Sequence, residues 1–327
     1  MKSKKFIIKR NERFINLQVI LKNNLSLFIL ITILLLFSFC KDSSSNKKSH
    51  KIKDLPNNVE HLLFQSDFIG EQNIIVSLPK DYNSTDRALK DKKYPLLILF
   101  SGRGEAIRSN YEGALGWVQY YSLPKTLNAI RRGQVTKNDF FELVTDEMLI
   151  KYNNNLEAKP YEEMVIACPK TPDLNYMISL DDKAYDNFIS KELIKILEDR
   201  YRIDKTKIGV DGVSLGGVYS CYFGLKYPDI FSSWGSIQGA TTAFMEIFKA
   251  LVDKNKEKIN KQKINIVTST DDYLKVNCQK LHQFLENNGI KHRFVMLQGP
   301  HDYIFNRGPG AIDMLIFHND ALNYPHN

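Results

Sequence analysis

The chain has 327 residues, of which 43% are hydrophobic and 25% charged, a composition typical of a globular protein with one large core or two small ones. Its formal net charge is +8, but residues 1–24 contribute +6 of it, so the rest of the chain carries only +2. Because the sequence shows no basic stripe with interleaved aromatic residues, it does not support binding to nucleic acid.

Residues 1–40 have the pattern of a targeting segment. A basic stretch leads into LSLFILITILLLFSFC (25–40), which has no charge, is short for a spanning helix of about 20 residues and is typical of a signal peptide. Cys40 ends this run, and the order resembles a bacterial lipoprotein signal with a lipidated cysteine, although Phe37 and Phe39 depart from its usual residues. An uncleaved signal anchor is the alternative. Either way we expect an exported protein held at a membrane through its N-terminus, in the periplasm or at the cell surface.

The residues after Cys40 are expected to form a flexible tether, 41–58, because KDSSSNKKSHKIKD (41–54) is polar throughout. The remainder, 59–327, is predicted to be one domain. Its cysteines form no C-x-x-C or Cys/His spacing, so no metal site is expected. Cys168 and Cys221 are predicted to be small buried hydrophobic residues.

Strands and helices are predicted to alternate along this domain. Apolar runs such as YPLLILF (94–100) are typical of strands buried on both faces, and they imply a mostly parallel sheet with helices on both sides. Strands are predicted at 73–79, 94–102, 162–169, 206–212, 231–237, 263–270 and 291–299, and helices at 188–201, 215–228 and 273–289.

One stretch, about 104–159, does not fit the alternation. It is rich in aromatic residues and has helical pieces. An insertion after the carboxyl end of a strand lies where α/β folds bind their ligands, so we expect it to border the site. Additional core helix is the alternative, and part of the stretch must serve that role.

A candidate nucleophile lies in VDGVSLGGVY (210–219), between a predicted strand and a predicted helix. Here Gly212-x-Ser214-x-Gly216 matches a nucleophile elbow, a sharp turn that presents a serine hydroxyl above the sheet. Gly212 and Gly216 are the small residues that the close passage of strand and helix requires. The N-terminus of the helix would favour negative charge developing at the site. A plain glycine-rich turn is the alternative.

A serine hydroxyl needs a base to take its proton, and after such an elbow the acid and then the histidine follow along the chain. Two later predicted strands end at Asp271-Asp272 and just before His301, so these groups are expected at the same sheet edge as Ser214. His301 would be the general base and then the general acid, with an aspartate orienting its ring. A solvated histidine and an aspartate turn are the plainer alternatives. The other histidines are expected in the tether, in loops or on helices.

An oxyanion hole needs two N–H groups directed at the tetrahedral oxygen. The backbone N–H of Leu215, next to the candidate serine, is the first candidate. The second is the N–H of Arg103, in SGRGEA (101–106) after a predicted strand, where Gly102 allows close approach. An ordinary turn is again the alternative. Arg103 and Arg108 are also expected to make the mouth of the pocket basic and to favour acidic substrates.

From about 72 to 302 the chain resembles the putative-esterase (esterase D-like) branch of the α/β-hydrolases. The similar blocks are IIVSLPKDYN…KKYPLLILFSG, the elbow block from YRIDKTKIGVDG to SSWGSIQGA, STDDYL and LQGPHDY. The resemblance implies an α/β-hydrolase fold and a triad acid at Asp272 rather than Asp271. Ser101 and Tyr303 replace a histidine and a tryptophan that are common in the family. The 104–159 stretch matches weakly, so no substrate follows from the resemblance.

The residues and the resemblance together predict a serine carboxylic-ester hydrolase that works through an acyl-enzyme, without metal or cofactor. Its substrate would be a small-molecule, glycan or lipid ester. An acyltransferase with the same triad remains an alternative, as does a non-catalytic surface binding lipoprotein on a hydrolase scaffold. The complete Ser-Asp-His set argues against the binding protein, and a peptidase is a weaker alternative.

Overall fold

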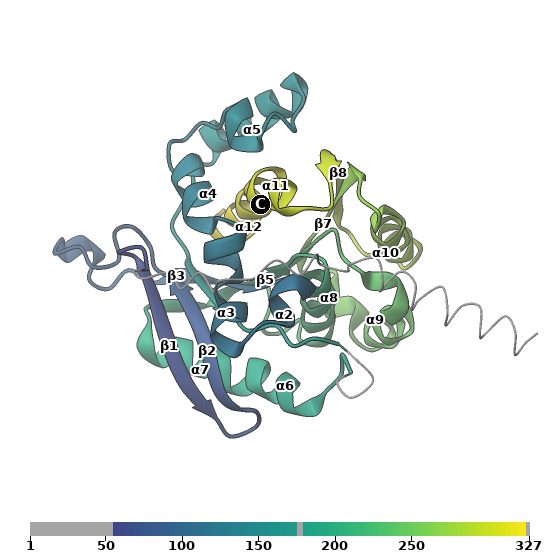
Figure 1. Cartoon of the computed structure of the whole chain (residues 1–327), viewed down its shortest axis with the longest axis horizontal. Helices are drawn as coiled ribbons and strands as arrows, with labels where there is room; N and C mark the ends of the chain where they lie inside the picture. The colour runs from purple at the N-terminus through teal and green to yellow at the C-terminus, as the bar shows by residue number, and fades with distance from the viewer. Residues whose placement is uncertain (1–54, 175–178, 325–327) are drawn as a thin grey trace, which may run out of the picture. The chain divides into compact units, whose positions relative to one another are not determined.

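A computed structural model describes residues 55–174 and 179–324. Eight strands form one sheet in the order β1-β2-β4-β3-β5-β6-β7-β8. β1 (Val59–Ser66) and β2 (Gly70–Ser77) form an antiparallel hairpin, drawn as the long purple strands in Figure 1, and β2 is antiparallel to β4. The other neighbours pair in parallel, as the alternating pattern predicts.

All seven predicted strands are present, with ends that differ by a few residues. They are β2, β3 (Tyr94–Phe100), β4 (Val165–Pro169), β5 (Ile203–Gly212), β6 (Ser233–Ile237), β7 (Lys263–Asp271) and β8 (Arg293–Pro300). The sequence analysis missed β1. This strand lies at the edge of the sheet and buries only Val59, Leu62 and Ser66, so its sequence lacks the apolar run of a central strand.

The predicted helices are present too, but others were missed. The predicted helix at 188–201 is a π-helical turn η4 (Phe188–Leu193) followed by α7 (Ile194–Arg200); the other two are α8 (Leu215–Lys226) and α10 (Lys275–Asn287). The missed ones are η1 (Arg87–Leu89), α6 (Lys183–Asn187), η5 (Thr241–Phe244), α9 (Met245–Ile259), α11 (Tyr303–Arg307) and α12 (Pro309–Asn323). α12 is buried along most of its length, so it has no clear polar face to reveal its period.

The sheet separates two hydrophobic cores. On β3, Leu96 and Ile98 belong to the core that includes residues of α7, α8, α9 and α10. Leu97 and Leu99 belong to the other core, with residues of α4, α5 and α12. Successive strand residues point to opposite faces, so a sheet covered by helices on both sides needs the continuous apolar runs seen in the sequence.

The stretch between β3 and β4 is built from short helical segments, coloured blue to teal in Figure 1. They are α2 (Arg103–Ala106), α3 (Asn110–Ala114), the π-helical turn η2 (Gly116–Tyr120), α4 (Leu123–Ile130), η3 (Lys137–Phe140) and α5 (Asp146–Ala158). Tyr152 of α5 donates a 2.6 Å hydrogen bond to Asp313 of α12, which also receives two from Arg293. Part of the stretch is therefore core, and its first helix begins at the site edge of β3.

The predicted signal segment 1–40, with Cys40, and the tether residues 41–54 lie outside the described residues. Within the described ranges no helix is long and apolar enough to cross a membrane. Cys168 and Cys221 are buried with free thiols, which confirms their prediction as small interior residues.

Candidate active site

The candidate catalytic residues follow three parallel strands at the same edge of the sheet. Ser214 comes after β5, Asp272 after β7 and His301 after β8. The residue pair Asp271 and Pro300 is in register between β7 and β8, which brings the acid and histidine loops side by side. This edge holds the carboxyl ends of the strands, where open α/β sheets place their sites.

Ser214 has an unusual backbone. Its φ of 55° and ψ of −109° lie outside the regions that L-residues normally occupy, and it directly precedes the first residue of α8. Such strain costs on the order of 1–3 kcal/mol and persists only where the surroundings enforce it. This is the strand–turn–helix geometry that the elbow pattern predicts, with a half-buried serine at its apex.

The two elbow glycines are required by close backbone contacts. A Cβ on Gly212 would lie 2.4 Å from the carbonyl of Gly216, and a Cβ on Gly216 would lie 2.2 Å from the carbonyl oxygen of Phe100. Any larger residue would push β5, α8 or the end of β3 apart. The glycines therefore keep the turn close to the end of β3. Residues 101–106, called the oxyanion loop below, follow directly after that end.

His301 and Asp272 are in direct contact. His301 Nδ1 lies 2.8 Å from Asp272 Oδ1, and the His301 side chain is about one-tenth exposed while that of Asp272 is fully buried. An ionised Asp272 can only accept a hydrogen bond, so Nδ1 carries the proton and donates it in this bond. The other ring nitrogen, Nε2, is then the one that can act as a base. The ring of Tyr273 also lies 4.5 Å from the His301 ring.

Asp272 and Asp271 are held differently. Asp272 accepts hydrogen bonds from the Thr268 hydroxyl at 2.9 Å and from the Leu274 N–H at 2.8 Å. Asp271 is exposed, and its carboxylate accepts from the hydroxyl of Thr270 beside it. The contact with His301 belongs to Asp272, as the family resemblance implies. Asp271 is the last residue of β7, so it lies in the strand rather than in the turn that the sequence analysis kept open for it.

A residue that the sequence analysis missed links the serine and histidine loops. The Ser214 N–H donates to the carbonyl of Ile237 at 2.8 Å. The side chain of the next residue, Gln238, is buried and donates to the carbonyl of Pro300, directly before His301, at 3.0 Å. No pattern in the sequence marks Gln238, because its role depends on β6 lying between β5 and β7.

The two predicted oxyanion donors both begin helices beside the elbow. Leu215 is the first residue of α8 and Arg103 the first of α2. A Cβ on Gly102 would lie 3.6 Å from the carbonyl oxygen of Val213, so the two turns are close neighbours. The Gly102 N–H donates to the Tyr121 hydroxyl at 3.0 Å, and Arg103 is the next residue along this loop.

The predicted basic character of the mouth is reduced by ion pairing. The Arg103 guanidinium lies 3.0 Å from Asp173, which offsets its charge. The Arg108 guanidinium carbon lies 4.5 Å from the centroid of the Tyr120 ring, a cation–π arrangement. The prediction of a preference for acidic substrates therefore depends mainly on Arg108.

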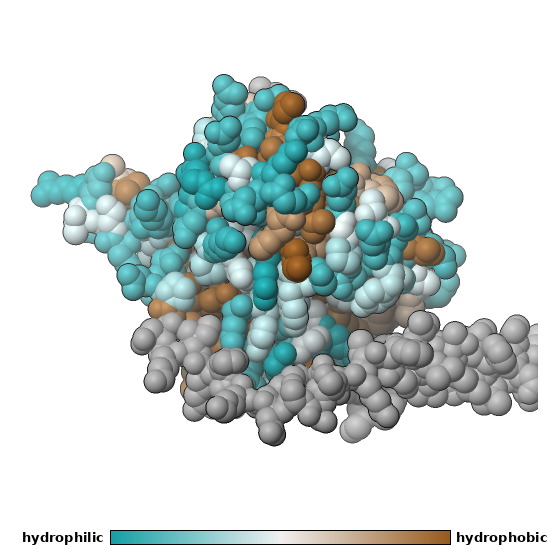
Figure 2. All heavy atoms as spheres, turned by 45° about the horizontal axis from the view of Figure 1, so that its top comes forward, coloured by the Kyte–Doolittle hydropathy of each residue, from teal (hydrophilic) through white to brown (hydrophobic). Residues whose placement is uncertain are grey.

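Exposed apolar residues occur in the loops that carry these groups. Tyr273 next to the acid, Ile304 near the histidine and Ile107 after α2 are 73%, 46% and 65% exposed. Figure 2, which brings the top of Figure 1 forward, shows apolar side chains running in a band down the middle of the face in view, between polar neighbours. The surroundings of the candidate site are thus partly apolar.

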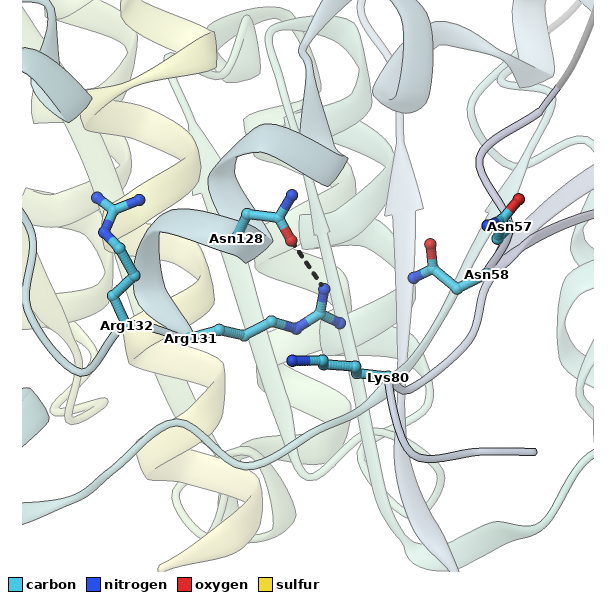
Figure 3. Close-up of a pocket in the computed structure, with 6 residues that line it drawn as sticks. All are labelled: Asn57, Asn58, Lys80, Asn128, Arg131 and Arg132. Carbon is cyan, nitrogen blue, oxygen red and sulfur yellow. Dashed lines mark hydrogen bonds between the residues drawn. The ribbon is translucent and has the colours of Figure 1, made fainter. Parts of the chain in front are cut away.

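A separate groove of about 440 Å³ lies elsewhere, lined by Asn57, Asn58, Lys80, Asn128, Arg131 and Arg132 (Figure 3). Lys80 follows β2, which runs antiparallel to β4, so the groove lies at the amino ends of the parallel strands, opposite the candidate site. Arg131 is paired with Glu163 at 2.6 Å and Arg132 with Asp139 at 2.6 Å. Most of the groove's positive charge is therefore offset, and no catalytic group lies there.

The described residues also contain no cluster of three or more His, Cys, Asp or Glu side chains able to hold a metal ion.

Comparison with known proteins agrees with this geometry. Residues 158–277, which span β4 to α10, match the sequence model of a family described as "putative esterase". No curated protein sequence matches the chain. The matched segment contains the elbow and Asp272, and it ends before His301.

Many solved structures have the same fold. A ferulic acid esterase is 17% identical with a TM-score of 0.60, covering 80% of this chain and 98% of that one. An S-formylglutathione hydrolase from Staphylococcus aureus is 16% identical with a TM-score of 0.58, covering 80% and 96%. A ferulic acid esterase from the anaerobic fungus Anaeromyces mucronatus is 19% identical with a TM-score of 0.55, covering 85% and 96%. The described domain therefore has an α/β-hydrolase fold, and its segment 158–277 carries the sequence pattern of the esterase family.

Proposed function

We propose that this protein is a serine esterase that hydrolyses carboxylic esters through Ser214, His301 and Asp272. The observation that carries the proposal is the contact between His301 Nδ1 and Asp272 at the sheet edge where Ser214 occupies a strained turn. The esterase-family match and the fold shared with esterases support the same reaction class. A histidine oriented by a buried carboxylate, at the same sheet edge as a strained serine, is the set of groups that acyl transfer requires.

In the proposed reaction the Ser214 hydroxyl attacks the ester carbonyl carbon while Nε2 of His301 takes its proton. The resulting imidazolium is stabilised by Asp272, whose other hydrogen bonds hold it in place. The tetrahedral intermediate then collapses, and His301 gives the proton to the departing alcohol oxygen. Water then attacks the acyl-enzyme while His301 takes a proton from it, and His301 returns this proton to the Ser214 oxygen as the acyl–oxygen bond breaks and the acid is released.

The negative oxygen of the tetrahedral intermediate would be bound by the backbone N–H groups of Leu215 and Arg103. Both residues are the first of their helices, so their N–H groups lie at helix N-termini, where negative charge is favoured. Removing one such donor from an oxyanion hole lowers kcat by about 10²–10³-fold in other enzymes. The glycines at 102 and 216 let the two turns come close enough to act on one oxygen.

An acyltransferase would use the same residues, with an alcohol in place of water. Product analysis with and without an added alcohol separates the two reactions, because only a transferase forms the new ester in preference to the free acid. A non-catalytic binding role would leave the strain at Ser214 and the His301–Asp272 contact without a purpose.

Fluorophosphonate labelling of the purified protein tests the proposal without knowledge of the substrate. We expect the wild type to label and Ser214→Ala to remain unlabelled. Ser233→Ala is the matched control, since Ser233 is fully buried and hydrogen-bonded to His318. A folded wild type that neither labels nor hydrolyses nitrophenyl esters would overturn the proposal.

We propose that Arg108 gives the site a modest preference for esters with a negative charge near the acyl group. Arg108→Ala is expected to lower kcat/KM for an anionic ester about fivefold more than for a neutral one of equal size, as expected for a partly exposed charge pair. Equal losses on the two esters would exclude a role in charge selection.

We also propose that the protein is exported and anchored through residues 1–40, with Cys40 lipidated. The support is the charge and hydropathy pattern of that segment. Cell fractionation and mass analysis of the N-terminal peptide, in wild type and Cys40→Ala, would test it. Release of the variant from the membrane supports lipidation, while retention of both supports an uncleaved anchor.

A further inference from the structure

A buried carboxylate connects the two loops on which the proposed reaction depends. Glu105, in α2, is 1% exposed, and each of its oxygens accepts a hydrogen bond from a tyrosine. Tyr121 donates to Oε2, and Tyr303 donates to Oε1 at 2.6 Å. Tyr303 follows His301 by two residues, so the carboxylate of the oxyanion loop is bonded directly to the histidine loop.

The same network reaches the backbone of the oxyanion loop. The Tyr121 hydroxyl that donates to Glu105 also accepts the Gly102 N–H at 3.0 Å. Gly102 directly precedes Arg103, whose N–H is the proposed second donor. The hydrogen bonds thus run from Gly102 through Tyr121 and Glu105 to Tyr303 without interruption.

The fit around Glu105 is close. A Cβ on Gly116 would lie 2.9 Å from the Glu105 Cγ, and one on Gly104 would lie 3.3 Å from the Tyr303 hydroxyl. Burial, followed by the charge of Glu105, raises the pKa of Tyr121 well above its usual value, so its hydroxyl keeps its proton and remains a donor. A buried carboxylate is costly unless its oxygens are hydrogen-bonded, so both tyrosines are needed to keep Glu105 here.

We propose that Glu105 is a positioning residue that, through Tyr121 and Tyr303, sets the oxyanion loop against the loop carrying His301. This inference rests on the proposed esterase function. It adds the contact that aligns the oxyanion loop with the loop carrying His301. Both bonds end on the same carboxylate, so displacement of either loop disturbs the other. Misplacement by about 1 Å is enough to lower the rate of a positioned reaction by 10²-fold.

Three variants test this role: Tyr303→Phe, Glu105→Gln and their double variant, assayed with a nitrophenyl ester. We expect each to lower kcat about tenfold with KM changed less than about twofold, since the transition state rather than substrate binding is affected. The rate of fluorophosphonate labelling is expected to fall in parallel. Because the two residues act through one contact, the double variant should lose little more than either single one.

Tyr201→Phe is the matched control. Tyr201 is a buried tyrosine that donates to a glutamate, Glu60, at 2.9 Å, but it lies before β5, at the opposite end of the sheet from the site. Its stability should fall somewhat less, because Glu60 is exposed and can bind water instead, and its kcat and labelling rate should stay at the wild-type values. A kcat loss in Tyr201→Phe equal to that in Tyr303→Phe would reduce the effect to general stability and overturn the inference.

The outcomes separate this inference from the proposed function. A wild type that labels and hydrolyses, beside folded Tyr303→Phe and Glu105→Gln variants with unchanged kcat and labelling, overturns the inference alone. A wild type without either activity overturns the proposed function and the inference with it. If Glu105→Gln fails to fold, Tyr303→Phe decides the matter, because it removes only the hydroxyl of a side chain that is 36% exposed.

Discussion

Two histidine–aspartate pairs in this protein have similar contacts and very different surroundings. At the sheet edge His301 Nδ1 lies 2.8 Å from Asp272, and in the interior His318 Nε2 lies 3.0 Å from Asp211. The edge pair is partly exposed through its histidine, whereas the side chains of the interior pair are 0% and 1% exposed. The chemical groups are the same, so any difference in what they do must come from where the fold places them.

The serines that accompany the pairs differ in the same way. Ser214 has a strained backbone at the start of α8, while Ser233 lies inside β6 with its hydroxyl 2.9 Å from His318 Nδ1. Both ring nitrogens of His318 are therefore engaged with buried protein groups, which leaves no base for a substrate. Ser233, His318 and Asp211 instead support the end of β5 just before the elbow, since Asp211 accepts the Gly212 N–H at 2.7 Å. A serine, a histidine and an aspartate in contact therefore do not by themselves identify a catalytic site.

Replacing the two histidines should separate the pairs most strongly. We expect His301→Ala to lower kcat/KM for a nitrophenyl ester by about 10⁴-fold or more and to cost less stability than His318→Ala, because Asp272 keeps its hydrogen bonds from Thr268 and Leu274. His318→Ala should do the reverse, because it leaves Asp211 buried without its partner, a loss of about 3–5 kcal/mol. Its activity per folded molecule should stay near that of the wild type.

Activity assays combined with urea unfolding measure both effects. His318→Gln serves as a milder variant if His318→Ala does not fold. A folded His318 variant that has lost activity as fully as His301→Ala would contradict the division between a catalytic and a structural pair.

A finer comparison lies within the acid loop itself. Asp272→Asn removes the carboxylate that orients His301, and kcat is expected to fall by about 10⁴-fold. Asp271→Asn changes the neighbouring exposed carboxylate in the same way and should leave kcat unchanged. Steady-state kinetics of the two variants decide the assignment, and equal losses would show that the loop, rather than one carboxylate, is responsible.

Much of this site could be predicted because its signals are local. The strained turn at Ser214 is encoded by flanking glycines, and Asp272 and His301 each follow an apolar strand. The fold could be predicted for the same reason, since buried parallel strands require continuous apolar runs.

The parts that could not be predicted depend on long-range contacts. Gln238 acts on Pro300 across 62 positions of sequence, and Tyr303 reaches Glu105 across 198. Neither residue lies in a pattern that marks a polar contact. His318, one of the histidines expected in the tether, in loops or on helices, lies on α12 but faces the interior, because α12 is buried on nearly all sides.

The smallest expected effect concerns the charge of the interior pair. Burial raises the pKa of Asp211 above its usual value, and the contact with His318 offsets only part of that rise. The folded state then binds a proton more tightly than the unfolded state does, so this group's contribution to stability is present below the usual aspartate pKa, near 4, and is lost as pH rises through the folded pKa.

Asp211→Asn cannot ionise, and its amide can still accept from the Gly212 N–H and donate to His318. As pH rises above about 4 the wild type should therefore lose stability that this variant keeps. The difference between their free energies of unfolding should change by roughly 1.4 kcal/mol for each unit by which the pKa of Asp211 is raised. Urea unfolding of both proteins at a series of pH values measures this difference. A difference that stays constant from acid to neutral pH would mean that burial does not raise the pKa of Asp211 in the folded protein.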